Sequence, residues 1–228
     1  MASIIDAFRE TFTDRFAFLK MLVLSIPTYF SYILYVKKSP DFIWLAILTV
    51  LLLLGFLIKV ANRVLNDKDS VLPSLNPFPL LWSAIKGLIA IGPISWISCF
   101  LANYFCSLIN IIPWLDIILK TILWIVAISI TLTSFLMFVT KESVIDAYRL
   151  KLLFNKAGDL IVVVIVLLIQ LLFMNAFTVG IVGYIIYVLF GWCDFLIFFI
   201  AYAVVFNIGA LGHYMAQSHY DILEKELN

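Results

Sequence analysis

The sequence predicts an all-α, polytopic transmembrane helical bundle with six spans, and three observations lead to this fold class. Hydrophobic residues make up 64% of the chain, with a mean hydropathy of +1.12, whereas about half the residues of a soluble domain are apolar. They gather in apolar stretches, and 228 residues leave room for about six spans of ~20 residues. A heptapeptide also occurs twice, each time ahead of a long apolar stretch.

The heptapeptide predicts an internal repeat. Ser3–Arg9 (SIIDAFR) returns as Ser143–Arg149 (SVIDAYR), and Trp82–Lys86 is a weaker third copy. We therefore expect one membrane domain, residues 1–228, built from three parallel pseudo-repeats, each an interfacial helix followed by a helix pair. Their approximate bounds are residues 3–66, 79–141 and 143–221. The alternative is that Ser-x-x-Asp helix starts arose independently.

The first pseudo-repeat opens with a predicted amphipathic helix over Ser3–Phe16, lying along the membrane interface. At the helical period its apolar side chains share one face; they are Ile4, Ile5, Phe8, Phe12 and Phe16. The first span follows over Phe16–Val36, with a kink at Pro27. The second span is predicted over Phe42–Asn62.

The second pseudo-repeat follows a polar, proline-rich connection over Asn66–Pro79. We expect a short interfacial piece from Leu80 and a break at Pro93, because proline lacks the N–H that a helix needs. The third span is then predicted over Ile94–Ile111, and the fourth over Leu115–Val139.

The last pseudo-repeat contains a run without charged residues from Leu160 to Cys193. As one helix it would extend about 51 Å, beyond the ~30 Å hydrocarbon core. We therefore expect a break or hinge at one of its glycines, which are Gly180, Gly183 and Gly191. The fifth span would be Leu160–Phe177, followed by a short re-entrant or outer-surface helix over Ile181–Leu189 and a sixth span over Phe195–Met215. The alternative is seven spans, with Gly180–Phe195 crossing.

The distribution of Lys and Arg predicts the orientation. With six spans, three basic residues, Lys37, Lys38 and Lys120, fall on one side of the membrane. The other twelve fall on the opposite side; they are Arg9, Arg15, Lys20, Lys59, Arg63, Lys68, Lys86, Lys141, Arg149, Lys151, Lys156 and Lys225. We therefore expect a multi-pass protein of the cell (inner) membrane with both termini in the cytoplasm.

Four polar side chains within the predicted spans are the candidate functional residues, because polar groups are costly in lipid. They are Asn103, Gln170, Asn175 and Asn207. One interpretation is hydrogen bonding between packed helices. The other is a polar substrate path between the pseudo-repeats.

No motif for catalysis, metal binding or cofactor binding is recognisable, so we expect no enzyme activity, metal or cofactor. His213 and His219 are six residues apart, and the three cysteines form no C-x-x-C pair. Cys106 and Cys193 could form a disulfide or remain packed thiols. With 15 basic and 14 acidic residues there is no field to attract nucleic acid, and the expected partners are membrane lipids and other membrane proteins.

Three segments carry a resemblance. They are Leu72–Leu75 followed by Pro79–Gly87, then Asp146–Arg149, and last Gly209–Gln217. Their pattern resembles an uncharacterised family of bacterial and archaeal six-helix membrane proteins, which is distantly similar to the membrane domain attached to some glycerophosphodiester phosphodiesterases. Where that family usually has an acidic residue and a Trp after Leu-Pro, this chain has Ser74-Leu75. The resemblance implies a six-helix membrane domain and transfers no catalytic residue.

Three functions therefore remain open at this stage. The first is a non-catalytic membrane component that acts as a scaffold, a lipid-organising module or a subunit of a membrane complex. The second is a small transporter or channel, which a polar cavity between pseudo-repeats would favour. The third, a membrane-embedded enzyme, fits the sequence least.

Overall fold

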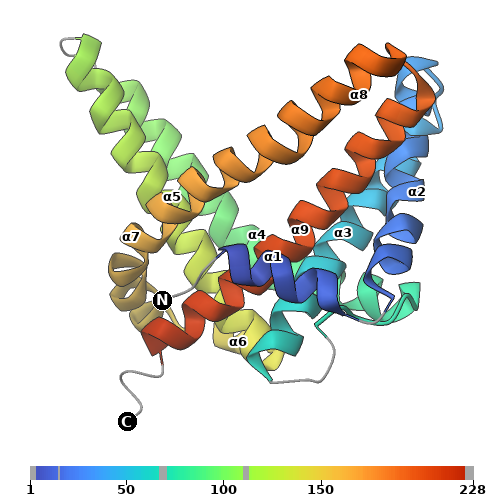
Figure 1. The fold of residues 1–228 in the computed structure, drawn as a ribbon. Helices are drawn as coiled ribbons and strands as arrows, with labels where there is room; N and C mark the ends of the chain where they lie inside the picture. The colour runs from blue at the N-terminus through green and yellow to red at the C-terminus, as the bar shows by residue number, and fades with distance from the viewer. Residues whose placement is uncertain (1–3, 15, 67–70, 110–112, 224–228) are drawn as a thin grey trace. The chain divides into compact units, whose positions relative to one another are not determined.

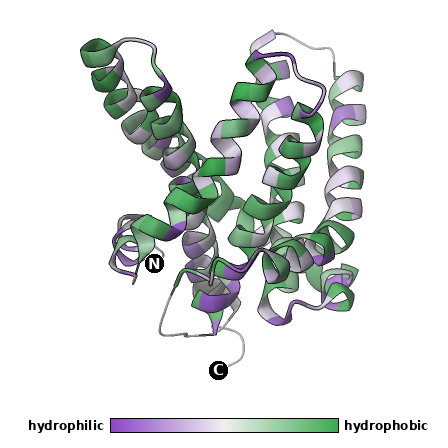
Figure 2. Ribbon diagram, turned by 90° about the vertical axis from the view of Figure 1, so that its right-hand side faces the viewer, coloured by the Kyte–Doolittle hydropathy of each residue, from purple (hydrophilic) through white to green (hydrophobic). Residues whose placement is uncertain are grey.

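The structure is a computed structural model that describes residues 4–14, 16–66, 71–109 and 113–223. These residues form helices and connections without a strand (Figure 1). Six helices are long and apolar enough to cross a membrane, and hydrophilic residues gather mostly at helix ends and in connections (Figure 2). The all-α class and the expected six helices of span length are therefore confirmed.

The helix bounds follow the predicted order closely. The first half of the chain contains α1 (Ile4–Thr13), α2 (Ala17–Val36), α3 (Phe42–Leu65) and α4 (Pro77–Leu108). The second half contains α5 (Pro113–Lys141), α6 (Val144–Ala147), α7 (Leu150–Asn175), the π-helical segment η1 (Ala176–Val182), α8 (Gly183–Phe190) and α9 (Asp194–Leu223).

The chain divides into two compact units whose boundaries fall within helices. Unit 1 comprises Met1–Ile85 and Gln170–Asp221, and unit 2 comprises Lys86–Ile169 with the remaining C-terminal residues. The boundaries lie inside α4 and α7, so each of these helices contributes to both units. The first unit thus combines early and late parts of the chain, which differs from the boundaries of the predicted pseudo-repeats.

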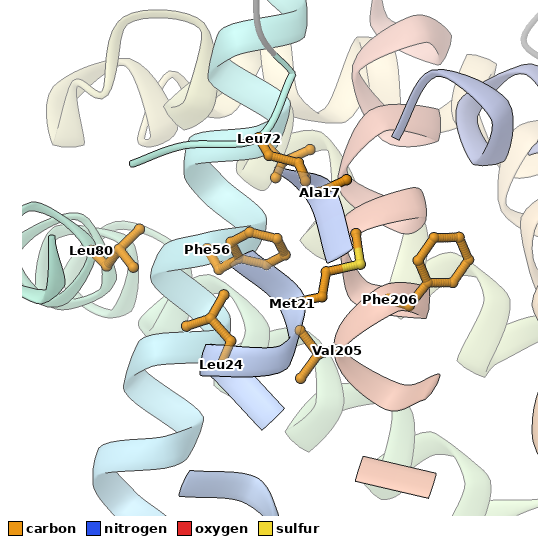
Figure 3. Packing of buried hydrophobic residues seen from close by; sticks show 9 residues of the cluster. Ala17, Met21, Leu24, Phe56, Leu72, Leu80, Val205 and Phe206 are labelled. Atoms are coloured by element: carbon orange, nitrogen blue, oxygen red, sulfur yellow. The ribbon is translucent and has the colours of Figure 1, made fainter. Parts of the chain in front are cut away.

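The core of unit 1 forms where α2, α3 and α9 pack together. Met21 of α2, Phe56 of α3 and Phe206 of α9 are buried in one cluster (Figure 3). Leu72, from the connection before α4, is fully buried in the same cluster. The cluster forms because α2, α3 and α9 bury apolar faces against one another.

Glycines let neighbouring helices of unit 1 approach closely. A Cβ placed on Gly55 of α3 would lie 2.0 Å from the carbonyl oxygen of Leu80. On α9, a Cβ on Gly212 would lie 3.0 Å from the carbonyl oxygen of Leu57. Small residues at helix contacts are typical of membrane proteins, where backbones pack without a side chain between them.

A buried ion pair ties the corner between α1 and α2 to the connection before α4. The Asp14 carboxylate, fully buried, accepts from Lys20 Nζ at 2.9 Å and from the Leu72 backbone N–H at 2.8 Å. Lys20 Nζ also donates to the Leu72 carbonyl oxygen at 3.0 Å. Phe16, at the corner itself, has a left-handed backbone with φ 61°. The ion pair therefore holds Leu72 in the core of unit 1.

In unit 2, α4 continues through Pro93, so the predicted break there is wrong. Proline cannot donate to the carbonyl four residues earlier, which belongs to Ile89. The hydroxyl of Tyr148 donates to this carbonyl oxygen at 2.6 Å. Nearby, Ile94 of α4, Met137 of α5 and Leu153 of α7 form a buried cluster. Because the Ile89 carbonyl oxygen accepts from Tyr148, it is not left unpaired and the helix can continue through Pro93.

The two heptapeptide copies form helices of different length. Ser143 caps α6 as predicted, its hydroxyl accepting from the Asp146 N–H at 3.4 Å, whereas Ser3 lies outside the described residues. The helix after Ser143 has 4 residues, whereas α1 has 10. Ala7 and Ala147, at matching positions, are both fully buried. The pseudo-repeat stays a prediction.

The uncharged run after Leu160 also differs from the expectation, because α7, η1 and α8 follow one another without a reversal up to Phe190. The fifth helix is therefore longer than predicted, and the predicted separation of a re-entrant or outer-surface helix over Ile181–Leu189 from the fifth span is wrong. A backbone in an apolar environment must satisfy its own hydrogen bonds, so it stays helical at Gly180 and Gly183. The helix ends at Gly191, whose φ of 68° suits glycine.

Candidate functional site

The candidate site is a polar cluster in unit 1, where α9 meets the junction of α7 and η1. The side-chain amide Nδ2 of Asn207 donates to Oδ1 of Asn175 at 2.9 Å and to Oγ1 of Thr178 at 3.2 Å. Asn207 is 5% exposed. Two of the four sequence-predicted polar residues are thus brought together, and Thr178 joins them.

Bonds to the helix backbone orient both acceptors of this cluster. Asn175 Nδ2 donates to the Leu171 carbonyl oxygen at 2.8 Å, and Thr178 Oγ1 donates to the Met174 carbonyl oxygen at 2.8 Å. With their hydrogens directed at the last turn of α7, the two side chains present oxygens to Asn207. The cluster sits where the α-helix changes into a π-helix, a feature that is often found at functional sites.

Two buried oxygens near this part of the chain have no hydrogen-bond partner among the described residues. They are Oδ1 of Asn207 and Oε1 of Gln170. Leaving a buried acceptor unpaired costs about 1–3 kcal/mol. Each oxygen therefore keeps an unused acceptor position that is closed off from the surroundings in this structure. Asn103, the fourth predicted residue, is exposed on the unit 2 part of α4 and is not part of the cluster.

The chemistry of the cluster is that of neutral hydrogen bonding. Two amides and one hydroxyl supply donors and acceptors but no group that ionises near neutral pH. Within the described ranges, no three His, Cys, Asp or Glu side chains come close enough to hold a metal ion. The three cysteines, Cys99, Cys106 and Cys193, are free thiols. The arrangement can hold helices together or contact a polar neutral group.

A second polar contact joins α1 to α9, and the sequence analysis missed it. Nε2 of His213, a residue that is 1% exposed, donates to Oε2 of Glu10 at 2.6 Å. Phe12 and Phe206 also join α1 to α9, with tilted rings whose centroids are 4.4 Å apart. The partners are separated by 203 residues, and no sequence spacing signals such a pair. Thr178 was missed for a different reason, since threonine is ordinary in apolar helices.

Comparison with protein-family models, curated proteins and solved structures finds no match to this chain.

Proposed function

We propose that this chain is a non-catalytic integral membrane protein that acts through its apolar surface, as a scaffold, a lipid-organising module or a subunit of a membrane complex. In this proposal both termini face the cytoplasm, and the protein resides in the cell membrane. The basic-residue asymmetry supports the orientation. The resemblance to six-helix membrane proteins supports the same class.

The observation that carries the proposal is the small share of span residues that the chain itself covers. In the most apolar part of α2, α3 and α4, 28% of residues are buried, and from α7 to α8 the share is 22%, whereas α5 and α9 are the more covered spans with 56% and 50%. Soluble monomers rarely expose such contiguous apolar surface. In this proposal lipids or partner helices cover these apolar faces, and the protein functions by contacting those lipids or helices.

The polar cluster supports a packing role within this proposal. The hydrogen bonds of Asn207 run to side chains of the same unit, and they join α9 to the end of α7 and to η1. Bonds of this kind between membrane helices contribute about 0.6 kcal/mol on average. Their contribution is to stability rather than to chemistry.

Photo-crosslinking and flux measurements on the full chain test the proposal. A photoreactive phenylalanine at Phe173, which is 70% exposed, should crosslink to lipids or to other membrane proteins in native membranes. The same group at Phe56, which is 1% exposed, is the matched control and should react only within the chain. Purified protein in liposomes should pass ions and small solutes no faster than protein-free liposomes. Saturable flux or substrate turnover would contradict the proposal.

A small transporter or channel is the second candidate, and one observation favours it. The unpaired oxygens of Asn207 and Gln170 could accept hydrogen bonds from a polar cargo. In that case Asn207→Leu would abolish flux, whereas Asn103→Leu, a matched change at an exposed position, would preserve it. Absence of flux in the wild-type protein would eliminate this candidate.

A further inference from the structure

An open depression in unit 2 lies at the start of α7. It has a volume of about 470 Å³ and is lined by Arg149, Leu150, Lys151, Leu152 and Asn155. Cationic and apolar side chains alternate along this lining, and all five residues are exposed.

The depression carries an excess of positive charge. Lys151 has no ion pair or hydrogen bond to any described residue. Arg149 pairs with Asp146 at 2.7 Å, yet its side chain remains 63% exposed. Because a guanidinium has five N–H donors, one carboxylate leaves others free. The lining therefore offers two cations against one neighbouring carboxylate, a balance that suits an anion with several oxygen acceptors.

Apolar side chains around the depression point to a membrane-surface ligand. Leu150 is 57% exposed, and Ile145 and Phe154 are 80% and 61% exposed. The uncharged run begins at Leu160, about 14 Å further along the helix axis. The headgroup layer is about 5–8 Å thick on each side of the ~30 Å core, so the depression lies at the aqueous edge of this layer, and the long side chains of Arg149 and Lys151 can reach back to the phosphates. Basic and apolar side chains together at such a depth are typical of a lipid-contacting interface.

We propose that this depression binds the phosphate of an anionic phospholipid, with Arg149 and Lys151 contacting phosphate oxygens and Leu150 and Leu152 contacting the adjoining atoms of the headgroup. Guanidinium and ammonium groups are the side chains that recognise phosphate. The inference rests on the proposed function and identifies the lipid class that the protein would organise.

The test measures phosphatidylglycerol adducts on the full chain by native mass spectrometry. Lys151→Gln and the double variant Arg149→Gln/Lys151→Gln should weaken phosphatidylglycerol binding by about fivefold for each basic residue removed. Phosphatidylcholine binding should change little. Lys141→Gln is the matched control, because Lys141 is an exposed lysine of unit 2, outside the depression and without a partner among the described residues.

Several outcomes would overturn the inference. Unchanged phosphatidylglycerol binding in Lys151→Gln would overturn it. This variant should fold normally, because Lys151 has no partner among the described residues. An equal loss in Lys141→Gln would mean unspecific attraction. Displacement of the lipid by soluble glycerol phosphate at equal concentration would assign the site to a free phosphate compound instead. Saturable flux with the lipid effect intact would overturn the proposed function alone.

Discussion

The hydroxyl of Tyr148 replaces the hydrogen-bond donor that Pro93 removes from helix α4. The carbonyl of Ile89 loses its helical donor at the proline and accepts from the tyrosine at 2.6 Å. Tyr148 lies in the second heptapeptide, where the first copy has Phe8, which has no hydroxyl. The second copy thus has a role that its sequence likeness to the first copy does not reveal.

We expect Tyr148→Phe to lower the free energy of unfolding by about 1 kcal/mol, because the Ile89 carbonyl loses its donor. In a Pro93→Ala background the restored N–H can bond this carbonyl, and Tyr148→Phe should cost much less. Thermal unfolding of the four proteins in detergent gives this double-mutant cycle. Equal losses in both backgrounds would contradict the pairing.

At Asn207 the amide group connects two helical segments. Asn207→Leu should lower stability by about 0.6–1.7 kcal/mol, because the oxygens of Asn175 and Thr178 lose their shared donor. Asn103→Leu, at an exposed position, is the control and should leave the unfolding temperature nearly unchanged. An Asn207→Leu protein as stable as wild type would argue against the packing role of the cluster.

Among the helices, the crossing of α3 with the start of α4 depends on a missing side chain. Gly55→Ala would place a Cβ 2.0 Å from a backbone oxygen, which cannot rotate away. We expect a loss of at least about 3 kcal/mol, at the upper end of overpacking costs. Gly158→Ala is the matched control, because nothing lies within 4 Å of its Cβ. It should stabilise α7 by up to about 1 kcal/mol.

If both glycine variants unfold at the same temperature as wild type, the close approach of α3 and Leu80 is not present in the protein. If both are destabilised equally, the effect comes from helix chemistry in general and not from this contact. Thermal unfolding followed by circular dichroism separates these cases.

Helix starts and ends were predictable wherever polar residues interrupt the apolar runs. Val36 ends α2 just before the lysine pair, and Phe42 begins α3 after Asp41, both as predicted. The continuation of α4 through Pro93 was not predictable, because its compensating hydroxyl lies 59 residues away. The continuous helix through Gly180 was not predictable either. In an apolar environment the backbone at a glycine keeps its helical hydrogen bonds, because no water is present to satisfy them.

The candidate site could be predicted only in part, because its residues are far apart in the sequence. Asn175 and Asn207 could be selected from the sequence, because amides within apolar runs are uncommon. Their mutual contact could not be predicted, because it depends on how α9 packs against the end of α7. Residue type therefore identifies candidates, whereas tertiary packing decides which of them meet.

For the whole molecule, the central claim is a six-span membrane protein with both termini in the cytoplasm. Cysteine labelling in intact cells tests it most directly, in a background without Cys99, Cys106 and Cys193. Lys38→Cys should react with an impermeant maleimide from outside, whereas Lys141→Cys and Asn228→Cys should react only after the membrane is opened. Labelling of position 228 from outside, or of positions 38 and 141 from the same side, would contradict the claim.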